Sequence, residues 1–358
     1  MHRTPTRAIA LPLLAAALLA GCQAAPPRPT DGGESGSAHA LECAQMVTNS
    51  GGLNDRSFNE TSWAGMQRAE QELGVRANVL VSTSESDLAP NVGAAVDTGC
   101  GFILTVGYEL APATADQAAR NPDVQFAIVD EIVEGDNVRP IVFDTAQAAY
   151  LAGYTAASVS QTGIVATFGG GNQPPVTLFM DGFAAGIDAY NAAKGTQVRL
   201  LGWNAATQDG TFTGDFENVQ LGQTQTQAFL AQGADVILPV AGQVGEGAFR
   251  ASLDAGGTAL VIWVDNDGYD TLPAEFRPIL LTSILKNTQD AVQSAIGDAL
   301  DGAISNEAVI GTLENGGVDI APFHDLESRV SDETRAELEQ LRERIVAGEI
   351  VVESPSSP

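Results

Sequence analysis

The sequence predicts an α/β protein of two similar lobes, each a doubly wound parallel sheet, with a hinged cleft between them. Short apolar runs alternate with amphipathic stretches of helix length, which is typical of parallel strands joined by crossover helices. Residues 41–358 exceed what one hydrophobic core usually holds. The pattern also repeats, because Gly99–Gly107 and Phe126–Asp130 resemble Gly233–Gly242 and Val261–Asp265 in the same order. We therefore expect a duplicated fold.

The N-terminal residues 1–22 have the features of a lipoprotein signal peptide. Two arginines precede the apolar segment 8–20, which is too short to span a bilayer comfortably. The segment ends in Leu-Ala-Gly-Cys22, which resembles the lipobox of bacterial lipoproteins. We expect lipid on Cys22 and a protein anchored to the cell membrane, facing the periplasm or the extracellular side. A soluble secreted form is the alternative.

The linker and the elements follow in order. Residues 23–40 are rich in Pro, Gly, Ser and Ala and lack an apolar period, which predicts a flexible linker. In the first half we expect strands at 44–48, 77–81, 102–106, 125–129 and 141–143, and helices at 58–73, 88–99, 110–120 and 145–160. In the second half we expect strands at 164–168, 198–203, 235–240, 260–264 and 279–285, and helices at 178–192, 217–232, 245–256, 287–301 and 332–347.

The order of these elements predicts how the chain divides into lobes. We expect residues 41–144 and 269–305 in lobe I, with the strand at 279–285 returning to it, and residues 145–268 and 306–358 in lobe II. Residues 310–320 resemble a hairpin that turns through Glu-Asn-Gly-Gly. The crossings between lobes then fall near 144, 268 and 305–320, as in two-lobed proteins that close around a ligand.

Composition excludes several classes of function. The formal net charge of −28 argues against nucleic acid or an anionic membrane surface as partners. Histidine is almost absent, so neither a metal site nor a Ser-His-Asp arrangement can be assembled, and we expect no metal and no cofactor. Cys43 and Cys100 precede neighbouring strands of the expected sheet, which leaves a disulfide or two buried thiols.

The candidate binding residues lie where strands end. Met46–Asn59 passes from an apolar strand through Asn49 and two glycines to Asp55 and Phe58. Ligands of open parallel sheets bind beyond the carboxyl ends of the strands, so this stretch resembles half of a binding cleft. An ordinary strand-to-helix loop with Phe58 in the core is the alternative.

Asp130 and Asp265 end corresponding strands of the two lobes. They can form an acid/base pair, as in glycoside hydrolysis, or accept hydrogen bonds from a ligand, or cap helices. Lys286 ends a further strand and can pair with one of the acids, or remain solvated. Phe58 and Phe179 begin equivalent helices and can sandwich a planar ligand, or belong to the core.

Six segments of the chain together resemble the basic membrane protein family, the PnrA-like nucleoside-binding lipoproteins that serve ABC transporters. They are GGLNDRSFNETSWAGM (51–66), NPDVQFAIVD (121–130), AAYLAGYTAA (148–157), DVILPVAGQVGEGAF (235–249), VIWVDNDGYD (261–270) and LTSILK (281–286). The resemblance covers almost the whole chain. It implies a type I periplasmic-binding-protein fold, no enzymatic activity, and capture of a nucleoside, purine type first, for delivery to an ABC transporter permease by a monomer.

The resemblance also implies roles for individual residues. Phe58 and Phe179 would clamp the base with Asn59 nearby, and Asp130, Asp265 and Lys286 would hold the ribose hydroxyls. The turn with Gly242 and Gly245, followed by a helix, would offer backbone N–H groups. One departure concerns Asn49, because the family commonly has Asp there, and an amide donates as well as accepts; this leaves other bases open. Asn-Asp-Gly at 266–268 also departs from the family's more usual Asp-Gln after the strand-end acid.

Two other functions stay open at this point. A sugar or polyol receptor of the same fold would keep the acids without needing two stacking faces. A surface carbohydrate-active enzyme would use Asp130 and Asp265 as its acid and base.

Overall fold

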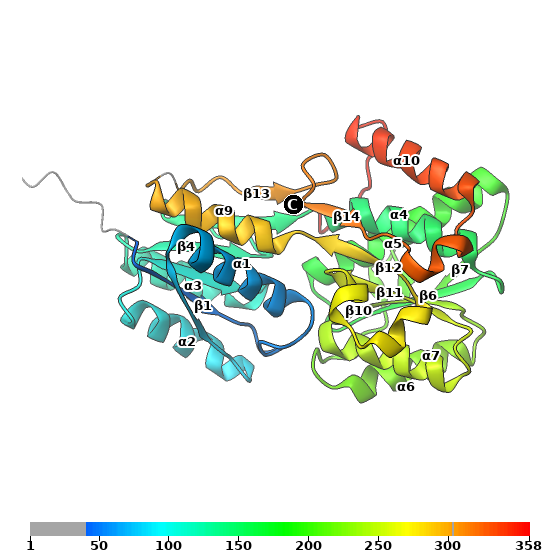
Figure 1. Ribbon diagram of the computed structural model, residues 1–358, viewed down its shortest axis with the longest axis horizontal. Coiled ribbons are helices and arrows are strands. Elements are labelled where there is room, and N and C mark those ends of the chain that lie inside the picture. The colour runs from blue at the N-terminus through cyan, green and yellow to red at the C-terminus, as the bar shows by residue number, and fades with distance from the viewer. Residues whose placement is uncertain (1–40, 303) are drawn as a thin grey trace, which may run out of the picture. The chain divides into compact units, whose positions relative to one another are not determined.

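Two six-stranded sheets carry the fold of the computed structural model, which describes residues 41–302 and 304–358 (Figure 1). The expected signal peptide with Cys22 and the linker 23–40 lie outside the described residues. We call the first sheet with its helices lobe I and the second sheet with its helices lobe II.

Lobe I contains a fully parallel sheet with strand order β13-β5-β4-β3-β1-β2. Its strands are β1 (Cys43–Val47), β2 (Arg76–Leu80), β3 (Phe102–Val106), β4 (Gln125–Val129), β5 (Val138–Phe143) and β13 (Val309–Gly311). Its helices are α1 (Phe58–Leu73), α2 (Glu85–Asp97), η1 (Tyr108–Leu110), α3 (Ala111–Arg120) and α9 (Thr288–Leu300).

Alternation along the strands sorts apolar residues onto the two faces of this sheet. Phe102 and Leu104 join the core that includes residues of α1 and α9, whereas Ile103 joins the core that includes residues of α2 and α3. Successive side chains of a strand point to opposite faces. Continuous apolar runs are therefore what a sheet buried on both faces requires.

Lobe II repeats this arrangement with the order β14-β12-β11-β10-β6-β7, parallel except for β14. Its strands are β6 (Ile164–Gly169), β7 (Arg199–Leu201), β10 (Val236–Val240), β11 (Leu260–Asp265), β12 (Leu280–Lys286) and β14 (Val318–Ile320), beside a small pair, β8 (Trp203–Asn204) and β9 (Asp209–Gly210). Its helices are α4 (Thr145–Val159), α5 (Pro174–Lys194), α6 (Val219–Leu230), η2 (Gly242–Gly245), α7 (Glu246–Asp254), α8 (Gly268–Thr271), η3 (Ala274–Ile279), η4 (His324–Arg329) and α10 (Asp332–Val346). β4 and β11 occupy the same position in the two sheets.

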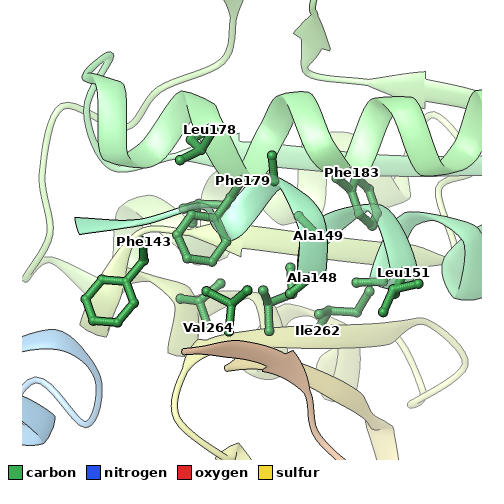
Figure 2. Close-up of a cluster of buried hydrophobic side chains, with 14 of the residues drawn as sticks. Phe143, Ala148, Ala149, Leu151, Leu178, Phe179, Phe183, Ile262 and Val264 are labelled. Atoms are coloured by element: carbon green, nitrogen blue, oxygen red, sulfur yellow. The ribbon is translucent and has the colours of Figure 1, made fainter. Parts of the chain in front are cut away.

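Helices α4 and α5 pack with their backbones in close contact. A Cβ on Gly153 would lie 2.1 Å from the carbonyl oxygen of Phe183, and one on Gly182 would lie 2.2 Å from that of Ala146. Only glycine allows this approach. The surrounding cluster, with Leu151 and Ile262, buries α4 on nearly all sides, as its apolar sequence predicts (Figure 2).

Two expectations about the C-terminal part of the chain were wrong. The strand expected at 279–285 does not return to lobe I, because β12 pairs in parallel with β11 of lobe II. Residues 310–320 are not a hairpin, because β13 pairs with β5 of lobe I and β14 with β12 of lobe II. Both errors have one cause: short apolar strands fit either sheet, and local pattern does not specify the distant partner.

The chain crosses between the lobes three times, after β5, after β12 and between β13 and β14. The second crossing is therefore near 287 and not near 268. The Asp144 N–H donates to the Gly311 carbonyl at 2.8 Å, and the Asn287 N–H donates to the Gly317 carbonyl at 2.8 Å. The third crossing is thus hydrogen bonded to both of the others.

A disulfide joins Cys43 and Cys100, whose Cα atoms are 4.9 Å apart. The two cysteines lie at the amino ends of β1 and β3, which are neighbours in the sheet. Of the two alternatives that the sequence left open, the structure contains the disulfide.

Candidate functional site

The carboxyl ends of the central strands of both sheets meet at a cavity. It encloses about 620 Å³, part of it open to solvent. Lobe I contributes Asn49, Gly51, Asp55, Phe58, Gly107, Tyr108, Glu109 and Asp130, and lobe II contributes Gln173, Pro175, Val176, Phe179, Phe216, Val240, Ala241, Gly242, Val264, Asp265 and Lys286. This is the position at which open α/β sheets bind ligands.

The strand-end acids Asp130 and Asp265 have the same unusual backbone. Asp130 has a φ of 70° and Asp265 a φ of 71°, in the left-handed region that non-glycine residues rarely adopt. Such strain is retained where the surrounding structure imposes it, often at ligand sites. The two acids therefore share one backbone conformation at equivalent positions of the two lobes.

Lys286 of lobe II forms an ion pair and hydrogen bond with Asp130 of lobe I. Both side chains are largely buried, with 3% of Lys286 and 9% of Asp130 exposed. Burial raises the pKa of Asp130, and the Lys286 ammonium opposes that rise. The ammonium also lies 4.6 Å from the ring centroid of Phe58, within the range of a cation–π contact.

Asp265 of lobe II accepts a hydrogen bond from the Ser57 hydroxyl of lobe I. Asp55 lies close enough to Asp265 for the two charges to repel each other. Asp55 also accepts hydrogen bonds from the N–H groups of Ser57, Asn59 and Glu60, at 2.8–3.1 Å, at the start of α1. Burial, the largest cause, and Asp265 raise the pKa of Asp55 to about 7, against the lowering effect of those hydrogen bonds.

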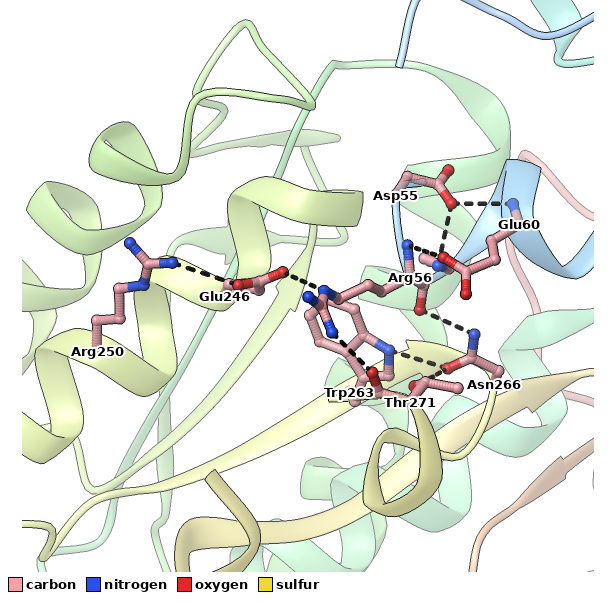
Figure 3. A network of polar contacts seen from close by, with 9 residues as sticks. Asp55, Arg56, Glu60, Glu246, Arg250, Trp263, Asn266 and Thr271 are labelled. Atoms are coloured by element: carbon pink, nitrogen blue, oxygen red, sulfur yellow. Dashed lines mark hydrogen bonds and ion pairs between the residues drawn. The ribbon is translucent and has the colours of Figure 1, made fainter. Parts of the chain in front are cut away.

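Arg56 holds the two lobes together beside the cavity (Figure 3). Its guanidinium donates to the Thr271 carbonyl at 3.0 Å and pairs with the buried Glu246 at 3.1 Å. Its own carbonyl accepts from the Asn266 amide at 2.8 Å, and the Trp263 indole N–H fixes that amide from the other side at 3.2 Å. We call Arg56, Glu246, Asn266 and Thr271 the Arg56 network. Its partners lie in different lobes, so separating the lobes would break it.

The aromatic side chains differ in how much surface they offer to a ligand. Phe58 is half-buried and lines the cavity. Phe179 also lines it but is only 2% exposed, within the core cluster of α5 (Figure 2). Phe216 is half-buried and lies over Gly170, where a Cβ would be 2.3 Å from its ring. Of these two lobe II rings, Phe216 is therefore the more accessible.

Most of the residues expected from the sequence meet in this one cavity. Asn49, Asp55, Phe58, Asp130, Phe179, Gly242, Asp265 and Lys286 all line it. Asn59 and Gly245 do not. Asn59 lies behind the wall, where its amide donates to Asn49 at 2.7 Å, and Gly245 packs against Trp263, where a Cβ would be 2.9 Å from the indole ring.

Sequence reasoning missed Phe216, Glu109 and the residues of the Arg56 network. The only signal for Phe216 was the run of three glycines at 169–171, two of which bring backbone against the rings of Phe212 and Phe216. In the part of the chain that the structure describes, no group of three metal-ligating side chains is present. The same residues include no helix with the length and apolar character needed to cross a bilayer.

These features define a two-lobed solute-binding protein of the type I periplasmic-binding fold. A solved structure of an ABC transporter solute-binding protein from Aeropyrum pernix K1 has a TM-score of 0.78 and 26% identity, covering 86% of this chain and 92% of that one. Residues 44–356 match the Bmp family, described as ABC transporter substrate-binding protein PnrA-like. The chain belongs to this family of substrate-binding proteins, which are not enzymes.

Named relatives cover nearly the same length. The chain is 28% identical to the "ABC transporter nucleoside-binding protein BmpA" of Lactococcus lactis, over 96% of this chain and 97% of that protein. It is 30% identical to the "CD4+ T-cell-stimulating antigen" of Listeria monocytogenes, over 87% and 88% of the two chains. The acid/base interpretation of Asp130 and Asp265 is therefore set aside.

Proposed function

We propose that the protein binds a nucleoside, purine type first, in the interlobe cavity and delivers it to an ABC transporter permease. The observation that carries this is the combination of an accessible aromatic wall with buried acids and one ammonium in a single cavity. The rings of Phe58 and Phe216, with Phe179 behind them, suit a flat base. The Asp130–Lys286 pair and Asp265 suit ribose hydroxyls, which both donate and accept hydrogen bonds.

The side chains that follow neighbouring strands of lobe I differ in chemistry along the cavity, which suits a ligand with two chemically different parts. β4, β3 and β1 are neighbours, so Asp130, Glu109 and Asn49 follow one another along the cavity. Two strand spacings separate the outer positions, about 10 Å. Asp130 faces the ammonium of Lys286 at one end, whereas Asn49 offers an amide at the other. The name of the Lactococcus lactis relative agrees with this division into ribose and base.

Calorimetric titration with nucleosides, free bases and sugars tests the proposal. We expect nucleosides to bind more tightly than either free bases or sugars, because only they use both ends of the cavity. Mass spectrometry of ligand released from freshly purified protein should recover an unchanged nucleoside. Binding of sugars alone would replace this proposal with a sugar receptor.

The aromatic wall has its own test. Phe58→Ala should weaken nucleoside binding about 10- to 100-fold, since stacking on one aromatic ring contributes roughly 1–3 kcal/mol. Leu221→Ala, on the outside of α6, is a control that removes exposed apolar surface without touching the cavity. Unchanged affinity in Phe58→Ala would place that ring in the core alone. Phe179→Ala and Phe216→Ala, compared in the same way, separate the two candidates of lobe II.

We further propose that lipid on Cys22 holds the protein at the outer face of a membrane. Cys22→Ala should move the protein from the membrane fraction to the soluble fraction and remove the lipid mass from its N-terminal peptide. Cells with this variant should also import labelled nucleoside more slowly. A variant that stays in the membrane fraction would contradict the anchor.

A further inference from the structure

At the end of the cavity where we place the base, the side chains of Asn49 and Glu109 both approach Gly107. A Cβ on Gly107 would lie 2.8 Å from Oε2 of Glu109 and 3.4 Å from Nδ2 of Asn49. Both residues line the cavity. The side chains of Glu109 and Asn49 therefore both pack against Gly107 and lie next to each other in the cavity wall, where one ligand edge can meet both.

The orientation of the Asn49 amide is set by its neighbours. Its Oδ1 accepts from the backbone N–H of Gly51 at 3.0 Å and from Nδ2 of Asn59 at 2.7 Å. A backbone N–H can only donate, so the oxygen must face it. The Nδ2 group then points away from these partners. It has no hydrogen-bond acceptor among the residues that the structure describes, and Asn49 lines the cavity. Asn49 thus presents a donor.

Glu109 presents a hydrogen-bond acceptor. Its carboxylate makes no ion pair or side-chain hydrogen bond with another residue in 41–302 or 304–358. It is half-buried, and burial together with nearby Asp130 raises its pKa. An ionised carboxylate is an acceptor with two oxygens, so it is best satisfied by two adjacent N–H donors of a ligand.

We propose that Asn49 and Glu109 select the base by its edge, and that they favour a 6-oxo-2-amino purine, the base of guanosine. This inference rests on the proposed function. The N1–H and the 2-amino group of that base donate to the two carboxylate oxygens of Glu109, and its 6-oxo group accepts from Nδ2 of Asn49. Asn59 is a positioning residue, because its amide keeps the Asn49 oxygen turned away from the cavity.

Other bases satisfy this pair less completely. Hypoxanthine, the base of inosine, keeps the oxo group and N1–H but lacks the second donor. Adenine offers one amino group to Glu109 and a ring nitrogen to Asn49, so one carboxylate oxygen stays unpaired. A hydrogen bond to a charged group contributes enough that we expect guanosine to bind about 10- to 100-fold more tightly than either.

Titration of guanosine, inosine and adenosine into the wild type and into two isosteric variants tests the proposal. Glu109→Gln replaces one acceptor by a donor, so guanosine should lose at least about 10-fold in affinity while adenosine, which pairs well with an amide, should not. Asn49→Asp keeps an oxygen for Gly51 and Asn59 but presents an acceptor to the 6-oxo group. Guanosine and inosine should both weaken.

Glu131→Gln is the matched control, because it removes the same charge next to Asp130 without being part of this cavity's lining. It should leave the order of the three affinities unchanged. Equal binding of guanosine and adenosine to the wild type, or an equal loss of all three in Glu109→Gln, would overturn the edge-reading pair while leaving a nucleoside receptor in place. Failure of every nucleoside to bind would overturn both.

Discussion

Asp130 and Asp265 occupy the same position in two copies of one architecture, yet their surroundings differ. Each follows or ends the matching strand of its sheet, and each has a left-handed backbone. Each contacts a residue of the opposite lobe. Asp130 meets the ammonium of Lys286, whereas Asp265 meets the neutral hydroxyl of Ser57 and has Asp55 as a nearby acid.

The two lobes share some features of these acids and differ in others. The left-handed backbone of these acids is common to both lobes, where it occurs at the same position in the strand order. The partners are not common, and they make one corner of the cavity cationic and the other acidic. A ligand that fits must therefore place different polar groups at the two corners. The contacts between the lobes bury one ion pair and one hydrogen bond from a hydroxyl.

Breaking the ion pair should have the largest effect. Lys286→Met leaves Asp130 buried without its cation, and removing one partner of a buried pair costs about 3–5 kcal/mol. Urea unfolding measures the loss. The loss of unfolding free energy should grow as pH rises. The variant lacks the charge that lowers the pKa of Asp130, so ionising Asp130 at higher pH leaves an unpaired buried carboxylate in the folded state.

The double variant Lys286→Met with Asp130→Asn should recover part of that stability, since no charge remains to be buried. Lys194→Met removes an ammonium paired with Glu333 and Glu337 at the surface, and it should change stability far less. Equal losses in the two single variants would mean that burial of Lys286 contributes nothing.

Titration of Asp55 should be the next largest effect, at the acidic corner. Its folded pKa of about 7 lies above the ordinary value of 3.8, so the protonated form is favoured by folding. Its stabilisation is complete below about pH 4 and is lost as pH rises through 7, by up to about 4 kcal/mol. The unfolding free energy of the wild type should therefore fall over this range relative to Asp55→Asn. Parallel pH profiles would show that Asp55 titrates normally.

Loss of the Arg56 network should have an intermediate effect. Arg56→Ala removes a cation from the buried Glu246 and a donor from the Thr271 carbonyl, at about 1–3 kcal/mol for groups left unpaired. Because these contacts form only between lobes, ligand affinity should drop about 10-fold or more. X-ray scattering of the ligand-free protein should show a larger radius of gyration. An unchanged radius would mean that the network does not hold the lobes closed.

Ser57→Ala should have the smallest effect. It deletes one hydroxyl donor to Asp265, and a typical intramolecular hydrogen bond contributes about 1 kcal/mol. Ser57→Thr, which keeps the hydroxyl, is the control for changes at the start of α1. Ligand affinity measured by calorimetry should fall less in Ser57→Ala than in Lys286→Met. The reverse order would show that the neutral contact matters more than the ion pair.

The sequence predicts which residues meet in the cavity better than it predicts the path of the chain. Asp130, Asp265 and Lys286 could be placed there because the end of a strand is marked locally, by an apolar run that stops at a charged residue. The fold class followed from the same periodicity, and the family and the solved structure confirm it.

The sheet that β12 joins, the separation of β13 from β14, and the place of Phe216 were not found. They depend on pairings with residues far away in the chain, which no local pattern encodes. The structure was needed for those, and also to show that Asn59 supports Asn49 from behind.

The three crossings between the lobes have a mechanical consequence. Because the Gly311–Gly317 segment is hydrogen bonded to both neighbours, and Gly311 leaves no room for a Cβ beside Phe143 and Gly317, the crossings cannot bend one at a time. We therefore expect the three crossings to act together as one hinge if the lobes open. A partner that contacts both lobes would then distinguish an open from a closed form by the distance between its two contact points.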